Sequence, residues 1–120
     1  AATRRTGGNP AKRTFQALRI EANDELGAIT RALPIALDLI AVGGRVVVLS
    51  FQSLEDRIVK EIFVDRSTSK SPRKLPVDLP EFAAKFALVS KSGETPTDKE
   101  LANNPRSASV RLRANEKVAA

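Results

Sequence analysis

An unbroken run of branched aliphatic residues, Val46–Leu49, constrains the fold of this chain more than any other feature. A run without polar alternation is typical of a strand that is covered on both faces, as in parallel sheets flanked by helices. Gly43 and Gly44, just before it, suit a tight turn from a helix into the strand. The sequence therefore predicts an α/β fold with this strand in the middle of the sheet.

A polar cluster follows the strand and forms the first candidate site. Ligands of open α/β sheets bind beyond the carboxyl ends of the strands, so we expect the chemistry to lie here. The candidate residues are Ser50, Gln52, Ser53, Glu55, Asp56 and Arg57. The alternative is purely structural: Ser53 would cap the next helix, with both acids in its first turn and Arg57 in an internal salt bridge.

Apolar residues at helical spacing predict three helices around this strand. The first begins between residues 12 and 14, and the second follows Asn23, a good N-cap residue. Pro34 either kinks the second helix or starts its continuation. The third runs from Ser53 to residue 65 or 66.

The C-terminal half predicts a loop and two more strands. Three prolines among Ser and Thr residues make 67–80 a long loop. The segments 86–90 and 109–114 are strand candidates, with a short helix over 97–103 between them. We expect these two strands to form an antiparallel pair at one edge of the sheet.

Composition excludes several kinds of chemistry. The chain has no Cys and no His, which removes thiol nucleophiles, disulfides, Cys/His zinc sites and histidine bases, and we expect no metal site. No apolar run approaches the roughly 18 to 20 residues that span a bilayer, and no signal peptide pattern is present. We therefore expect a soluble, cytoplasmic protein without a membrane partner.

The positive charge of the chain is clustered. The formal net charge is +6, from 20 Lys and Arg residues against 14 Asp and Glu residues, and the segments 1–20 and 66–74 contain basic but no acidic residues. Clustered cations suit a polyanion, of which nucleic acid is the commonest, and the alternative is an ordinary basic surface. Because Tyr and Trp are absent and Phe is sparse, we do not expect binding by base stacking on aromatic rings.

The chain reads as part of a larger domain. Residues 1–12 are polar and rich in turn formers, which indicates an exposed arm or the end of an upstream segment. Residues 13–120 would form the C-terminal portion of a domain. Two features favour this interpretation: the chain has no initiator Met, and the strand that should precede the helices in a βαβ unit is not evident.

Five motifs in order along the chain resemble the C-terminal part of a bacterial family, the ribosomal RNA small subunit methyltransferase H family. The motifs are 13–20 (RTFQALRI), 23–26 (NDEL), 43–45 (GGR), 53–60 (SLEDRIVK) and 104–107 (NPRS) with 111–113 (RLR). The resemblance implies part of a class I, Rossmann-like methyltransferase sheet, with helices and three strands that include the antiparallel edge pair. It also implies methylation, dependent on S-adenosylmethionine, of N4 of a cytidine (cytosine 1402) in 16S rRNA of the small ribosomal subunit.

The same resemblance places the cofactor site outside this chain. Family members carry the glycine-rich S-adenosylmethionine loop and the acidic ribose-binding residue in an N-terminal portion, followed by a helical insertion. Because the adjacent glycines here make no Gly-x-Gly pattern, we expect no cofactor-binding residues in this chain and no activity of this chain alone. Many family members have His where this chain has Asn9 and Gln52, which argues against an obligatory histidine base.

Two further groups of residues become candidates for RNA contact. The first shares one face of a continuous helix and consists of Arg13, Gln16, Arg19 and Asn23. The alternative for this group is a solvated face with an Asn cap. The second is Arg111 and Arg113, which alternate with apolar residues and would point to one side of a half-exposed edge strand. There they would bind phosphate or protect the edge by charge.

Two other interpretations of the whole chain stay open. One is a non-catalytic basic RNA-binding or ribosome-associated module. The other is an inactive fragment that is stabilised by self-association. A truncated sheet would leave the Val46–Leu49 strand without a paired neighbour. Its exposed edge would then favour the formation of homo-oligomers.

Overall fold

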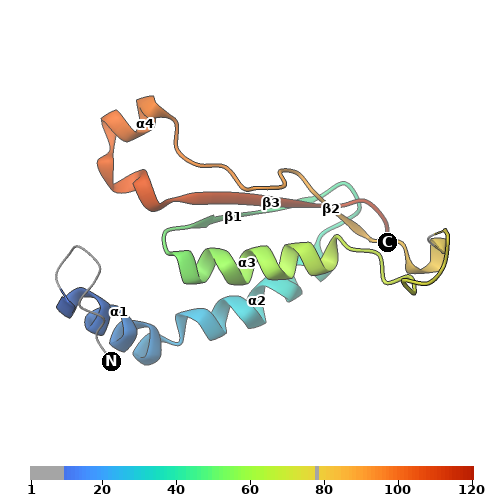
Figure 1. Cartoon of the computed structure of the whole chain (residues 1–120), viewed down its shortest axis with the longest axis horizontal. Coiled ribbons are helices and arrows are strands. Elements are labelled where there is room, and N and C mark those ends of the chain that lie inside the picture. Colours follow the sequence, from blue (N-terminus) through green and yellow to red (C-terminus); the bar gives the residue numbers. More distant parts are fainter. Residues whose placement is uncertain (1–9, 78) are drawn as a thin grey trace.

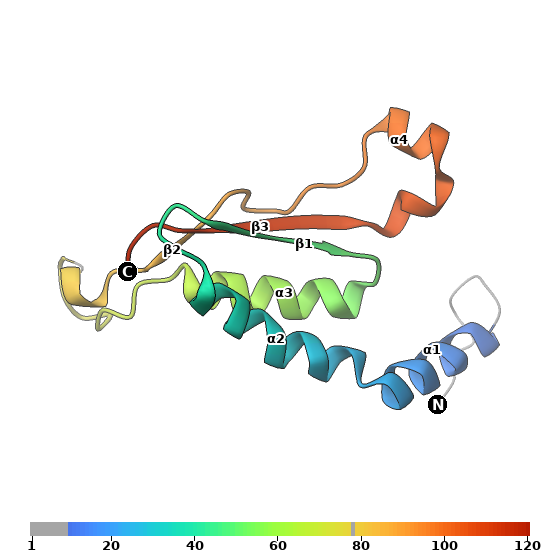
Figure 2. The same ribbon diagram turned by 180° about the vertical axis from the view of Figure 1, so that it is seen from behind.

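The computed structural model describes residues 10–77 and 79–120 (Figure 1). The elements, in chain order, are α1 (Pro10–Asn23), α2 (Glu25–Leu39), β1 (Arg45–Ser50), α3 (Ser53–Arg66), η1 (Pro80–Phe82), β2 (Phe86–Leu88), α4 (Asp98–Asn103), η2 (Pro105–Ser109) and β3 (Arg111–Lys117). Helix α3 lies along the sheet and α2 lies along α3, while α1 extends beyond them at one end (Figures 1 and 2). The predicted α/β class is confirmed, whereas most of the predicted arm, residues 1–9, lies outside the described part.

The sheet has three antiparallel strands in the order β1-β3-β2. The register of β1 on β3 runs from Arg45 opposite Glu116 to Ser50 opposite Arg111, and β2 pairs with the other side of β3. The predicted antiparallel pair of late strands is therefore confirmed. The prediction that the Val46–Leu49 strand lies in the middle is wrong for the described residues, because β3 takes that place.

The aliphatic strand is covered on one face only. Val46 and Val48 pack against the core, but Val47 and Leu49 are 57% and 50% exposed. The prediction of a strand covered on both faces is thus wrong within the described part of the chain. The reason is that α3 packs against only one face of the sheet, and the side chains of a strand alternate between its two faces.

The hydrophobic core forms between α2, α3 and the sheet. Its buried members are Leu33, Leu37, Val59, Phe63 and Phe86. Each of these side chains contributes about 1.5 to 3 kcal/mol by leaving water. The core therefore fixes α2 and α3 relative to the strands that lead to the site.

The middle strand owes its position to polar side chains as well as to apolar ones. Asn115 of β3 is fully buried, and it accepts a hydrogen bond from Ser67 Oγ at 3.0 Å and donates one to the Phe63 carbonyl at 3.4 Å. A buried amide is tolerated only where its hydrogen bonds are satisfied. These bonds therefore tie β3 to the end of α3.

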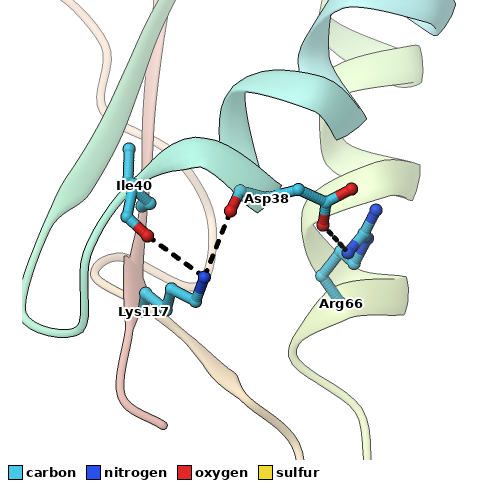
Figure 3. A network of polar contacts seen from close by, with 4 residues as sticks. All are labelled: Asp38, Ile40, Arg66 and Lys117. Atoms are coloured by element: carbon cyan, nitrogen blue, oxygen red, sulfur yellow. Dashed lines mark hydrogen bonds and ion pairs between the residues drawn. The ribbon is translucent and has the colours of Figure 1, made fainter. Parts of the chain in front are cut away.

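The end of α2 is capped by a side chain from β3. Lys117 Nζ donates to the carbonyl oxygens of Asp38 and Ile40 at 3.3 and 3.1 Å, and Arg66 Nη1 contacts Asp38 Oδ1 at 2.7 Å (Figure 3). A cation suits the negative end of a helix dipole. The predicted glycine turn follows, with Gly43 at φ 86° and its N–H donating to the Lys117 carbonyl at 2.7 Å.

At the junction of α1 and α2, the N-cap residue of α2 differs from the predicted one. Asn23 is the last residue of α1, and Asp24 occupies the N-cap position with a left-handed backbone (φ 50°) and no side-chain cap bond. Asp tolerates this conformation better than most residues. Its carboxylate instead pairs with Arg31 at 2.8 Å and lies where a Cβ on Gly27 would clash. Pro34 lies inside α2, which continues past it to Leu39.

The remaining local predictions agree closely with the structure. Helix α3 ends at Arg66 as expected, although Gln52 rather than Ser53 is its N-cap residue. Helix α4 has the predicted capping box, in which Thr97 and Glu100 exchange hydrogen bonds. The late strands are observed at Phe86–Leu88 and Arg111–Lys117.

Candidate functional site

Two grooves open at the end of the molecule where β1 ends and α3 begins. In Figure 2, α1, the start of α3 and η2 lie together at this end. The first groove has a volume of about 840 Å³ and lies between α1, the β1–α3 turn and the start of β3. It brings together six of the predicted site residues, namely Gln16, Arg19, Gln52, Ser53, Asp56 and Arg111.

The second groove is smaller, about 400 Å³, and adjoins the first. The two share Ser53, Asp56 and Arg111 in their walls. The second also takes in Arg57 and Arg113 from the predicted set. The polar cluster after β1 therefore faces two neighbouring depressions.

Asp56 and Arg113 form the central ion pair between these grooves. Arg113 Nε and Nη2 lie 2.6 and 3.0 Å from the two carboxylate oxygens of Asp56, and the side chains are only 9% and 16% exposed. The hydrogen bond from Arg113 lowers the pKa of Asp56 against the opposing effect of burial, and the charges of Arg113, Arg111 and Lys60 lower it further. This two-pronged contact fixes the start of α3 to the middle strand.

The expectation that Arg111 and Arg113 share a half-exposed edge strand needs correction. Both lie on β3, which is the middle strand of the described sheet, so neither protects an edge. Arg113 is buried against Asp56. Arg111 is exposed and lines both grooves.

Several predicted residues do not line the first groove. Ser50 is buried at the end of β1, and Glu55 is half-buried in the first turn of α3. Arg13 and Asn23 are exposed on α1 but do not line the first groove. Arg57 forms an exposed ion pair with Glu61, one turn along α3, at 3.6 Å.

Helix α1 contributes residues that the sequence interpretation missed. Lys12 and Phe15 line the first groove beside Gln16 and Arg19. These four residues are three or four positions apart, which places them on one face of a helix. The sequence pattern alone could therefore have indicated Lys12 and Phe15. Phe51 also lines this groove, and Phe15 and Phe51 are 69% and 57% exposed. The groove thus has two aromatic rings in its walls, and the expectation of binding without base stacking stays a prediction.

The side-chain amide of Gln52 is unusual because its oxygen atom makes no hydrogen bond. Its Oε1 atom is buried and has no hydrogen-bond partner among the described residues. An unsatisfied buried acceptor costs about 1 to 3 kcal/mol, so such a group calls for an explanation. The atom is closed to solvent, so the Gln52 side chain must shift within the first groove before a ligand can reach it.

The described residues do not fit the S-adenosylmethionine that the resemblance implies. The Gly43–Gly44 turn precedes β1 and therefore lies at the opposite end of this strand from the grooves. The carboxylate between the grooves, Asp56, is held by Arg113. Among residues 10–77 and 79–120, no group of three His, Cys, Asp or Glu side chains could hold a metal ion. In the same residues, no helix is both long and apolar enough to cross a membrane.

Comparison with known proteins identifies the family. Residues 1–118 match the MraW methylase family. A ribosomal RNA small subunit methyltransferase H from Rhodococcus opacus is 57% identical over 119 residues, which cover 99% of this chain and 35% of that relative. Those from Saccharopolyspora erythraea and Corynebacterium diphtheriae are 59% and 60% identical, over 98% and 97% of this chain and 36% and 34% of the relatives. The chain spans about a third of the length of these relatives, and it belongs to the MraW methylase family.

Proposed function

We propose that this chain is the C-terminal part of a class I, S-adenosylmethionine-dependent methyltransferase that acts on N4 of a cytidine in 16S rRNA. In this proposal the first groove holds the target nucleotide. The observation that carries it is the convergence of six predicted residues from α1, the β1–α3 turn and β3 on one groove. The names of the relatives, ribosomal RNA small subunit methyltransferase H, support the choice of substrate.

The groove offers groups that suit a cytosine base. A shift of the Gln52 side chain would expose its unpaired amide oxygen, which can then accept a hydrogen bond from the exocyclic amine. The Ser53 hydroxyl can bond another polar edge of the base, and Phe15 and Phe51 offer rings for packing. Lys12 and Arg19 supply positive charge for the backbone.

These residues act by holding the exocyclic amine of the cytosine in the correct orientation. Neither groove contains a histidine base, since the chain has no His. A fixed acceptor at Gln52 orients the amine, and correct orientation can supply several kcal/mol of catalysis. The residues that bind the methyl donor belong to the rest of the full-length enzyme.

The proposal is tested by methylation of 16S rRNA with the full-length enzyme that carries this chain. We expect Gln52→Ala and Ser53→Ala each to lower the methylation rate about tenfold, the effect of one lost hydrogen bond. Ser90→Ala is the matched control, because Ser90 lines neither groove. Normal rates with only a lower melting temperature would show that both residues are merely structural.

A wild-type enzyme that binds 16S rRNA and transfers no methyl group would contradict the proposed reaction. The non-catalytic RNA-binding module would then be the better interpretation.

A further inference from the structure

The second groove is a concentration of positive charge beside the proposed nucleotide groove. Five cations line it against a single carboxylate, that of Asp56. The cations are Arg57, Lys60, Lys91, Arg111 and Arg113. Asp56 is already held by Arg113, so it leaves the other cations largely uncompensated.

Three of these cations have no ion-pair partner in the described part of the chain. Lys60, Lys91 and Arg111 lie within 4.0 Å of no carboxylate there. Lys60 and Arg111 act on Asp56 only through the longer-range effect that lowers its pKa. Unpaired like charges that face one depression repel one another, and a bound anion relieves that repulsion.

The groove also offers hydrogen-bond donors. Ser53 and Ser92 line it with hydroxyl groups, and Ser53 is the first residue of the 14-residue helix α3. No side chain of the described residues caps the start of this helix. Backbone N–H groups at a helix start favour an anion, which here adds to the charge of the side chains.

We propose that the second groove binds a phosphodiester group of the RNA strand next to the target nucleotide, with Lys60 and Lys91 as its principal ligands. The inference rests on the proposed function. The two grooves share Ser53 and Arg111, so a nucleotide in the first leads its backbone directly into the second. A volume of about 400 Å³ is ample room for a phosphodiester group.

The test compares two double variants of the full-length enzyme that lose the same charge. Lys60→Gln with Lys91→Gln removes the proposed ligands, which are exposed and form no ion pair with a described residue. Lys74→Gln with Lys85→Gln removes two exposed cations that line neither groove. The measurement is affinity for an RNA strand that contains the target cytidine, over a range of salt concentrations.

We expect the groove variant to bind RNA about tenfold more weakly than the control variant. Its plot of log affinity against log salt should be shallower by about 0.7, the value for one contacted phosphate of a single strand. In a second arm, the phosphate beside the cytidine is replaced by an uncharged methylphosphonate. The replacement should weaken binding by the wild type and have no further effect on the groove variant.

The outcomes separate this inference from the proposed function. If the enzyme methylates the RNA but the groove and control variants bind alike, the phosphate site is wrong and the proposed function stands. If the methylphosphonate weakens the groove variant as much as the wild type, the phosphate lies elsewhere and the inference is overturned. Absence of methylation by the wild type would contradict the proposed function instead.

Discussion

Arg113 and Asp56 show how one pair of side chains supports both grooves. Both are largely buried, and their contact joins the middle strand to the start of α3. We predict that Arg113→Met lowers the free energy of unfolding by about 3 kcal/mol, because it leaves Asp56 buried without a partner. Arg57→Met is the control, since its exposed pair with Glu61 is worth at most about 0.5 kcal/mol. Urea titration measures both, and equal losses would contradict the prediction.

The same pair makes stability depend on pH. The pKa of Asp56 is lowered in the folded protein, chiefly by the hydrogen bond from Arg113, so the folded state holds its proton less tightly than the unfolded state. This stabilisation is complete above the ordinary pKa of an aspartate and is lost as the pH falls through the lowered value. We predict that Asp56→Asn is less stable than the wild type at neutral pH, and that the difference shrinks in acid. A constant difference across the titration would be inconsistent with this assignment.

The candidate residues could be predicted where the sequence pattern that marks them lies within a few neighbouring positions. The polar cluster at the end of β1 follows from a single apolar run, and three of its residues, Gln52, Ser53 and Asp56, line the first groove. The partner of Arg113 was not predictable, because Asp56 lies 57 positions away and nothing in the local pattern links them. The place of Phe15 in the wall of this groove was not predictable either, because its partners there lie far away in the sequence.

Among the secondary-structure elements, the cap on α2 is the clearest example of a contact between distant segments of the chain. Lys117 of β3 bonds two carbonyls at the end of α2, across a separation of 79 positions from Asp38. We predict that Lys117→Met destabilises the fold by about 1 kcal/mol, since the last carbonyls of the helix lose their cation. Amide hydrogen exchange should rise in the last turn of α2 and in the turn to β1. Unchanged exchange there, with the same loss of stability, would place the effect elsewhere.

Helix limits were more predictable than strand positions. Caps and breakers act over three or four residues, which is why α3 and α4 were predicted nearly to their observed limits. Strand order depends on pairings between distant segments. The middle strand β3 carries buried Arg113 and Asn115, which an apolar pattern would never select. Their partners on α3 make that position stable.

At the scale of the whole molecule, β1 has one edge that pairs with no described residue. Val47 and Leu49 are also half-exposed on its open face. We predict that this 120-residue chain self-associates as its concentration rises, because an unpaired strand edge is a template for pairing. Sedimentation measures the mass, and Val47→Lys should shift it towards the monomer. A monomer at every concentration would contradict the prediction.

The chain by itself should also fail to bind the methyl donor. In the proposed function, its two grooves supply only the substrate side of the site. Calorimetric titration of this chain with S-adenosylmethionine should therefore give no heat of tight binding, whereas the full-length enzyme should. Tight binding by the chain alone would overturn the division of the site between two parts of one enzyme.

The left-handed residue between α1 and α2 has a consequence for the thermodynamics of binding. Asp24 alone connects the helix that forms one wall of the first groove to the helix packed in the core. The two backbone torsions of Asp24 set the direction in which α1 leaves α2, and Asp24 also pairs with Arg31. Glycine at this position would keep the left-handed torsion and widen its range, so the added cost of binding RNA would be entropic.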